Sequence, residues 1–285
     1  MGRDLYDNCP AARAVYDQAE AAWPGLRALC FDGPADALNQ TVNTQPCLFV
    51  TDLACAAAAV DAGLRPQGLA GFSLGEVAAA CFADVMPFDQ ALNFVRRRAE
   101  AMAAGGQRQP GTMVAVLGLD QATVEAVAAS AGAYPVNFNC PGQIGVACAV
   151  DQVDVLRQAV TAAGGKALPL AVSGAFHSPL MDQAAADLAV WAADLDFALP
   201  QLPLYANLTA QPYGDPYELL TAQVNHPVRW QDSVTAMVAA GFDHFVEVGP
   251  GTTLSGFIRK IDRNAQTMSI NDSASLAATA QVFRV

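Results

Sequence analysis

A glycine-bounded serine at the start of an alanine-rich segment is the feature that most limits the folds open to this chain. The run Gly71-Phe72-Ser73-Leu74-Gly75-Glu76 follows a short apolar segment and precedes the helical pattern of residues 77–82. In a tight strand-to-helix turn, a serine takes a strained backbone conformation that exposes its hydroxyl, and flanking glycines let neighbouring segments approach closely. The bare G-x-S-x-G pattern also fits an ordinary structural turn. With a strand before it and a helix after it, the pattern favours Ser73 as a nucleophile.

Length and charge narrow the class of protein. The chain has 285 residues, 53% of them hydrophobic, and a formal net charge of -12. Charged or turn-forming residues interrupt every long apolar run, so we expect no membrane span. The first residues lack the basic and then apolar pattern of a signal peptide, which predicts a cytoplasmic protein. The acidic balance argues against nucleic acid as a partner, because binding phosphates needs clustered Lys and Arg.

The cysteines and the basic residues give weaker signals. Seven cysteines include no C-x-x-C pair, and most lie in apolar runs. Buried reduced thiols explain them better than disulfides or a zinc site, and we expect neither a metal nor a resident cofactor. The one concentrated basic stretch, residues 259–263, fits a solvated helix end as well as an anion-binding patch.

Helical patterns alternate with short apolar strands along most of the chain. Residues 47–62 and 89–104 are predicted helices, the second ended by Gly105-Gly106. Residues 69–71 and 244–248 are predicted strands. This alternation predicts an α/β layer architecture with a parallel sheet.

A different pattern covers residues 112–172. Strands, helices and strands are predicted there in the order βαββαβ, which is the split βαβ or ferredoxin-like unit. We therefore expect a main domain made of residues 1–111 and 173–285, with residues 112–172 inserted as a subdomain. The predicted elements are residues 113–117, 121–130, 135–139, 144–150, 152–163 and 166–170.

Three histidines could supply the base that a serine nucleophile needs. His226 precedes a proline in a polar loop, and His244 lies on a predicted strand among apolar residues, so a structural role suits both. His177 lies in a loop bounded by glycine and proline, where the chain returns from the inserted unit. Functional residues concentrate on such loops. His177 is therefore the first candidate base, with His244 as its rival.

Arg98 lies on an apolar face of the second predicted helix. At about 3.6 residues per turn it shares that face with Ala91, Phe94, Val95 and Met102. An arginine held against a core needs an anionic partner, because an unpaired buried charge is very costly. That partner is either an Asp or Glu of the protein or a carboxylate on a substrate, which the planar guanidinium could hold with two hydrogen bonds.

Several motifs together resemble those of malonyl-CoA:acyl carrier protein transacylases. The resemblance runs from Met1 to about Arg263 with order and spacing kept. Beside the Ser73 motif and Arg98 with Met102, the matching segments are Thr44-Gln45-Pro46, Asn139-Cys140-Pro141-Gly142-Gln143, Gly174-Ala175-Phe176-His177-Ser178-Pro179-Leu180-Met181, Pro227-Val228-Arg229-Trp230 and Glu247-Val248-Gly249-Pro250-Gly251.

The resemblance implies an enzyme that moves malonyl from malonyl-CoA to the phosphopantetheine thiol of acyl carrier protein, for fatty acid synthesis, through an ester on Ser73. His177 would be the base, oriented by the backbone carbonyl of Gln223 rather than by an acid. Arg98 would hold the malonyl carboxylate, and Leu74 would supply one N–H of the oxyanion hole. The implied fold is an α/β-hydrolase-like main domain, the implied partners are the carrier protein and the coenzyme A thioester, and the implied oligomeric state is a monomer.

The resemblance also bears on the substrate pocket. Phe176 matches a phenylalanine of malonyl-selecting relatives, whose bulk disfavours an α-methyl branch. We therefore expect malonyl over methylmalonyl, by about 1 to 3 kcal/mol for one methyl group. Phe72 stands where most relatives carry histidine and is expected to alter the pocket wall rather than the chemistry. Met102, beside Arg98, belongs to the same expected substrate-binding set.

The start of the chain departs from the family pattern. The family begins with a strand and a G-Q-G-S-Q loop, whose first glutamine supplies the second oxyanion N–H, whereas this chain opens on Met1-Gly2-Arg3-Asp4-Leu5. We therefore expect an N-terminally truncated version of an active enzyme, since one lost donor typically costs on the order of 10² to 10³ in rate. The alternatives are a polyketide-type acyltransferase, an acyl hydrolase of the same fold, and a catalytically impaired protein that binds the carrier.

Overall fold

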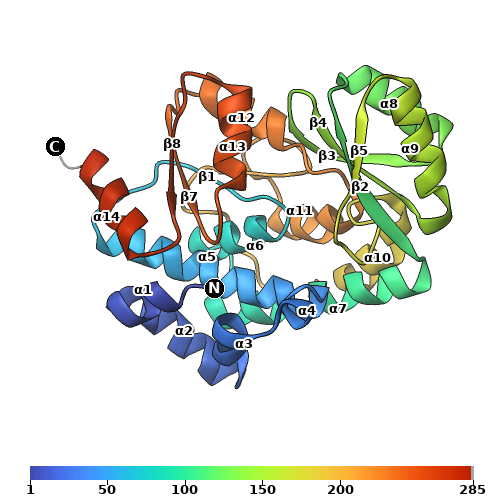
Figure 1. The fold of residues 1–285 in the computed structure, drawn as a ribbon. Coiled ribbons are helices and arrows are strands. Elements are labelled where there is room, and N and C mark those ends of the chain that lie inside the picture. The colour runs from blue at the N-terminus through green and yellow to red at the C-terminus, as the bar shows by residue number, and fades with distance from the viewer. Residues whose placement is uncertain (284–285) are drawn as a thin grey trace.

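The computed structural model describes residues 1–283. A layer of helices forms the base of the fold. Above this layer, strands β7 and β8 with helices α12 and α13 lie on one side, and an inserted αβ unit lies on the other (Figure 1). The helices outside the inserted unit are α1 (Arg3–Asn8), α2 (Pro10–Ala22), α3 (Leu26–Asp32), α4 (Ala35–Leu38), α5 (Thr41–Asp61), α6 (Leu74–Phe82), α7 (Phe88–Arg108), α10 (Asp182–Ala192), α11 (Pro216–Ala222), α12 (Trp230–Ala239), α13 (Thr253–Ile261) and α14 (Ser273–Val282).

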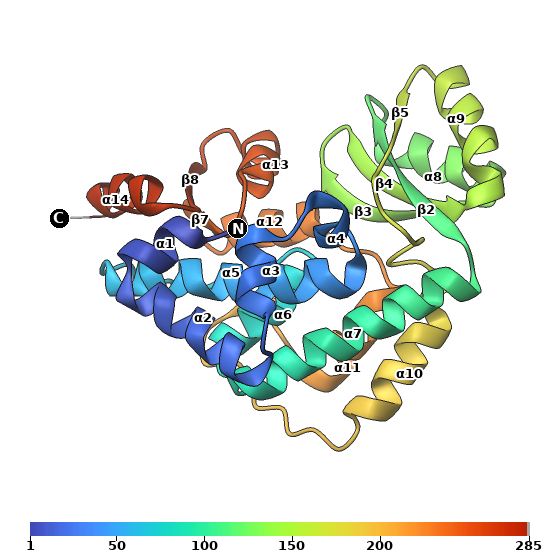
Figure 2. The ribbon, with the colours of Figure 1, turned by 60° about the horizontal axis from the view of Figure 1, so that its bottom comes forward.

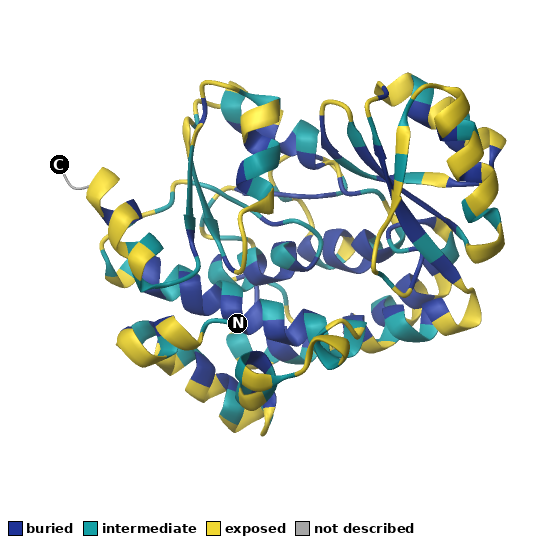
Figure 3. Ribbon diagram, in the orientation of Figure 1, coloured by how far each residue is buried: buried dark blue, intermediate teal, exposed yellow. Residues whose placement is uncertain are grey.

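Helix α5 is the buried centre of the helical layer, and it contacts α2, α6 and α7. It corresponds to the helix predicted over residues 47–62, but it begins at Thr41 and includes Pro46. A proline inside a helix removes one backbone hydrogen bond, and burial of the proline with its neighbours Gln45 and Cys47 offsets that loss. Figure 3 shows buried residues along this layer and also on the sheet of the inserted unit.

Helix α7 does not end where the sequence predicts. It continues through Gly105-Gly106 to Arg108, so the expected glycine stop is wrong. A Cβ on Gly105 would lie 3.0 Å from the sulfur of Met181, and one on Gly106 would lie 2.6 Å from the carbonyl oxygen of Ser173. The two glycines therefore permit close approach of the segment 173–181, which carries His177. Helix α10 packs beside α7 at this end (Figure 2).

The strands outside the inserted unit form two separate parallel pairs. Strand β1 (Leu69–Ala70) pairs with β6 (Leu204–Tyr205), and β7 (His244–Val248) pairs with β8 (Gln266–Ile270). Strand β7 has its predicted bounds, and the predicted strand at residues 69–71 ends at Ala70. The fold is α/β as expected, but the described residues form two short pairs in place of the one parallel sheet that the sequence predicts.

Between α7 and the His177 segment, the chain forms an antiparallel four-stranded sheet in the order β3-β4-β2-β5. One face of this sheet packs on α8 and α9, while its other face, with Met113, Val136 and Ala147, packs against Ala175. Because side chains alternate between the faces of a strand, the same strands cover their helices and support the His177 segment. The elements are β2 (Gly111–Leu117), α8 (Gln121–Ser130), β3 (Tyr134–Cys140), β4 (Gln143–Ala149), α9 (Val153–Ala162) and β5 (Lys166–Pro169).

Two further expectations concern the composition. All seven cysteines are free thiols, six of them buried and Cys81 partly exposed. Within residues 1–283, no helix is both long enough and apolar enough to cross a membrane.

Candidate active site

Ser73 lies in the turn between β1 and α6, the strand-turn-helix context that its motif predicts. Its φ of 53° and ψ of -108° place it outside the conformations that non-glycine residues favour. A Cβ on Gly71 would overlap the backbone of Gly75, so no larger residue fits there. An added Cβ on Gly75 itself would meet no atom within 4 Å. The prediction that a glycine is needed for close approach of the backbone is therefore confirmed at Gly71 and wrong at Gly75.

Asn207 stabilises this strained turn from another part of the chain. Its Oδ1 accepts a hydrogen bond from the Ser73 N–H at 2.7 Å, and its Nδ2 donates to the carbonyl of Gly71 at 2.6 Å. The side chain is buried. Asn207 follows Ser73 by 134 residues, so no local sequence pattern indicates this contact.

His177 is the histidine that the structure brings to Ser73. Its Nε2 lies 2.7 Å from Ser73 Oγ, and its Nδ1 lies 2.9 Å from the carbonyl oxygen of Gln223. Because a carbonyl only accepts, Nδ1 carries the proton and Nε2 is free to accept one from the serine. The backbone of His177, at a φ of 62°, is held by its N–H donating to Val224 at 2.9 Å.

The environment of His177 keeps its ring neutral. Burial is the largest cause and the positive charge of Arg98 is the second, and they lower the pKa of His177 to about 4. The other two histidines hydrogen-bond elsewhere: His244 Nδ1 lies 2.7 Å from Asp243 Oδ1, and His226 Nδ1 lies 2.9 Å from the carbonyl oxygen of Ala222. The rival candidate His244 is thus not part of the Ser73 site.

Arg98 is buried beside the serine, with 1% of its surface exposed. Its Nη2 donates to Ser73 Oγ at 3.1 Å and to Gln223 Oε1 at 2.6 Å, and its Nη1 donates to Gln45 Oε1 at 2.6 Å. Its Nε has no partner within the described residues. Burial lowers the pKa of Arg98 to about 10, which leaves the group protonated at neutral pH.

The ion pairs of residues 1–283 do not include Arg98. No Asp or Glu of those residues contacts the guanidinium directly, and the buried Glu76 acts on it only through its charge. The guanidinium instead contacts neutral oxygen atoms. A buried cation that no carboxylate contacts directly, 3.1 Å from Ser73 Oγ, is a site that can receive an anionic group.

The residues predicted to bind the substrate beside Arg98 differ in what they contact. Met102 is buried, and its sulfur accepts a hydrogen bond at 3.3 Å from Gln45 Nε2, which places it next to the arginine's own partner. Phe176 packs against both the main core and the supporting sheet. Phe72 packs edge-on against Trp230, with ring centroids 5.8 Å apart.

Leu74 is the first residue of α6. The N–H groups of a first helical turn have no acceptor within the helix, and the helix dipole favours negative charge near them. The amide of Leu74 is thus free of the helical hydrogen-bond ladder at the position next to the nucleophile. Within residues 1–283, no group of three or more His, Cys, Asp or Glu side chains is placed to hold a metal ion.

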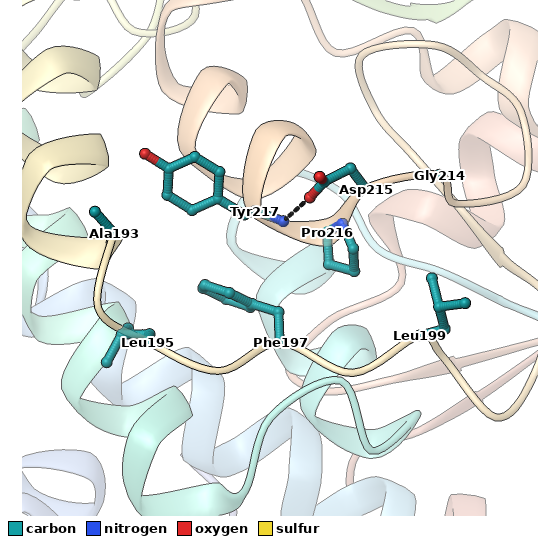
Figure 4. A pocket seen from close by; sticks show the side chains of 8 residues that line it. All are labelled: Ala193, Leu195, Phe197, Leu199, Gly214, Asp215, Pro216 and Tyr217. Carbon is teal, nitrogen blue, oxygen red and sulfur yellow. Dashed lines mark hydrogen bonds between the residues drawn. The ribbon is translucent and has the colours of Figure 1, made fainter.

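Two cavities differ in their relation to this centre. A cavity of about 340 Å³ reaches His177 between strand β3 and the segments 179–182 and 225–227, so it gives access to the base along the edge of the inserted unit. A larger one of about 680 Å³ lies between residues 193–199 and the start of α11 (Figure 4). None of the residues around Ser73 lines the larger cavity.

Comparisons with known proteins identify the family of the chain. Residues 1–279 match the acyl transferase domain family. The chain is 34% identical over 294 residues to the malonyl CoA-acyl carrier protein transacylase of Bacillus subtilis (strain 168), with all of this chain and 93% of that protein covered.

Two solved structures have nearly the same fold. The transacylase of Streptococcus pneumoniae shares 36% identity at a TM-score of 0.94, over 99% of this chain and 95% of that one. A malonyl-transacylase solved in complex with a type II PKS acyl-carrier protein shares 32% identity at a TM-score of 0.95, over 99% of this chain and 94% of that one. With its strained serine in a strand-turn-helix and a family match over almost its full length, this chain belongs to the acyl transferase family.

Proposed function

We propose that this protein transfers a malonyl group from malonyl-CoA to the phosphopantetheine thiol of an acyl carrier protein, in the supply of malonyl units for fatty acid synthesis. The observation that carries the proposal is the buried guanidinium of Arg98, 3.1 Å from Ser73 Oγ and bonded only to neutral oxygens. A plain acyl group would leave this cation without a carboxylate in contact, whereas a malonyl carboxylate would bind it directly. The matching relatives are named for this reaction.

In the first half-reaction, His177 Nε2 takes the proton of the Ser73 hydroxyl while Oγ attacks the thioester carbonyl. The N–H of Leu74 stabilises the resulting oxyanion. The carbon–sulfur bond then breaks, and the coenzyme A thiolate takes the proton from His177, which leaves malonyl on Ser73 as an ester. The Gln223 carbonyl keeps the imidazole in the tautomer that this step needs.

The second half-reaction runs the same steps in reverse with a new thiol. His177 takes the proton of the phosphopantetheine thiol, the sulfur attacks the ester carbonyl, and Ser73 Oγ leaves with that proton. Each carrier departs before the next one reacts, so the kinetics are ping-pong. Throughout, Arg98 keeps the malonyl carboxylate away from the reacting carbonyl, and Phe176 opposes an α-methyl branch.

A polyketide-type acyltransferase is the second candidate. The solved transacylase bound to a type II PKS carrier has a fold almost identical to that of this chain. The two candidates share every step at Ser73 and differ only in the carrier, so a comparison of transfer rates to a fatty acid carrier and a polyketide carrier separates them.

The exposed Arg259 and Lys260 would receive an acidic carrier, with Lys166 as a further contact. Lys260 Nζ lies 3.3 Å from Gln143 Oε1, so this end of α13 meets strand β4 of the inserted unit. If Arg259→Glu leaves the KM for the carrier unchanged, this docking role is wrong.

We further infer that residues 112–172 are a ferredoxin-like subdomain within an α/β-hydrolase-like main domain, and that the protein acts as a monomer. The strand order β3-β4-β2-β5 supports the ferredoxin-like subdomain.

The test is to supply malonyl-CoA and a carrier bearing phosphopantetheine and to separate the products by mass. The proposal predicts malonyl-carrier with the wild-type protein and none with Ser73→Ala. Free malonate as the main product would indicate the hydrolase alternative. Carrier binding without any malonyl product would indicate the catalytically impaired alternative.

A further inference from the structure

Glu76 is a buried carboxylate next to the site, and it contacts no cation directly within the described residues. It lies in the first turn of α6 with 1% of its surface exposed. Its Oε1 accepts hydrogen bonds from the Asn207 N–H at 3.1 Å and from the Tyr213 hydroxyl at 2.7 Å. Its Oε2 accepts from Gln223 Nε2. Three donors from residues 207–223, all more than 130 positions from Glu76 in the sequence, therefore meet on this one carboxyl group.

Gln223 connects Glu76 to every reacting group of the site. Its Nε2 donates to Glu76 and, at 2.9 Å, to the carbonyl oxygen of Ser73. Its Oε1 accepts from Arg98 Nη2 at 2.6 Å, and its backbone carbonyl accepts from His177 Nδ1 at 2.9 Å. The side-chain amide thus lies between the Arg98 guanidinium, which only donates, and the Glu76 carboxyl, whose Oε2 accepts from it.

Only one orientation of the Gln223 amide satisfies both neighbours. A guanidinium has no acceptor, and the Glu76 oxygen that faces the amide, Oε2, accepts from Gln223 Nε2. If the amide were turned over, its NH₂ would face the N–H groups of Arg98 and its oxygen would face the oxygens of Glu76. An unsatisfied buried polar group is costly, so Glu76 acts together with Arg98 and the Ser73 carbonyl to fix which way the amide points.

We propose that Glu76 is a positioning residue for malonyl transfer: its carboxylate orients the Gln223 amide so that the amide oxygen holds Arg98 beside Ser73. The inference rests on the proposed function, because the position of Arg98 affects turnover only when the acyl group carries a carboxylate. Glu76 itself touches neither the nucleophile's oxygen nor the base. Its effect reaches the reaction through Gln223 and Arg98.

The substitution Glu76→Gln tests this role, because it keeps the shape of the side chain and removes the requirement for a donor from Gln223. We expect the rate of Ser73 malonylation by malonyl-CoA to fall at least tenfold more than the rate of acetylation by acetyl-CoA. Tyr213→Phe is the matched control, since it removes a donor from Glu76 without touching Gln223. That variant should lose stability but keep the malonyl-to-acetyl ratio of the wild type.

Equal losses with both acyl groups, or no loss with either, would overturn the proposal, because a purely structural role would not change the ratio. If Glu76→Gln does not fold, Glu76→Asp serves instead. Its shorter side chain withdraws the acceptor from Gln223, so the ratio should again fall, and an unchanged ratio would refute the role. Failure of the proposed function itself is seen separately, as absence of malonylation in the wild-type protein.

Discussion

Removal of the Arg98 side chain should weaken malonyl transfer far more than transfer of an uncharged acyl group. The guanidinium is 1% exposed, has no carboxylate partner in residues 1–283, and keeps an unpartnered Nε beside the nucleophile. Truncating one member of a buried, hydrogen-bonded charge pair costs about 2 to 5 kcal/mol. Since part of the hydrogen-bonding capacity of Arg98 is already used on Gln45 and Gln223, we expect malonyl transfer to lose about 3 kcal/mol of transition-state stabilisation. This loss corresponds to roughly 10²-fold in kcat/KM.

The assay is the rate at which Ser73 is acylated by malonyl-CoA and by acetyl-CoA in Arg98→Ala. Arg97→Ala is the matched control, because Arg97 neighbours Arg98 on α7, is 46% exposed and pairs with Glu100. It should leave both rates unchanged. The malonylation rate of Arg98→Lys should lie between those of the wild type and Arg98→Ala, since lysine keeps the charge and lacks the planar guanidinium. Equal losses of malonyl and acetyl transfer in Arg98→Ala would refute the carboxylate-binding role, and melting temperatures separate that result from general unfolding.

Three further predictions concern the turn and the base. Gly71→Ala should abolish labelling of Ser73 by a fluorophosphonate probe, whereas Gly75→Ala should be labelled and should melt as the wild type does. Equal labelling of the two variants would contradict the close approach at Gly71. Asn207→Ala should lower the free energy of unfolding by about 1 to 3 kcal/mol, measured in urea, because it leaves two buried backbone groups at the turn unpaired. Because the pKa of His177 is lowered to about 4, the ring stays neutral above that value; kcat/KM for acetyl-CoA, which needs neither Arg98 nor Glu76, should hold from pH 7 to about pH 5 and fall as the pH drops through about 4, and a fall centred near the ordinary histidine value of about 6.5 would contradict this environment.

Local patterns are sufficient for much of the fold. The inserted unit can be predicted element by element because its strands and helices are short and separated by turn residues; the helix predicted at residues 121–130 has those bounds in the structure. Strand β7 likewise has its predicted bounds, 244–248. In such segments, side-chain periodicity and turn chemistry agree with the tertiary packing.

Errors arise where packing overrides a local signal. Pro46 and the pair Gly105-Gly106 are helix breakers by propensity, yet α5 and α7 continue through them. Pro46 is buried in α5, and the two glycines let the His177 segment approach α7. A single sequence carries no sign of the neighbour that makes a breaker tolerable.

The candidate site divides in the same way. Ser73 and His177 can be proposed from their local context, and Arg98 from its place on an apolar helix face. Asn207 and the role of Glu76 cannot, because their hydrogen bonds join residues more than a hundred positions apart, such as Asn207 N–H to Glu76 Oε1 at a separation of 131. Such contacts exist only after the chain has folded.

The mass of the intact protein after incubation with malonyl-CoA alone tests the central role of Ser73 most directly. We expect a mass increase of one malonyl group, mapped by peptide analysis to Ser73 and lost when a carrier with a free phosphopantetheine thiol is added. Malonyl on any other residue, or a wild-type protein that gains no mass while remaining folded, would contradict that role.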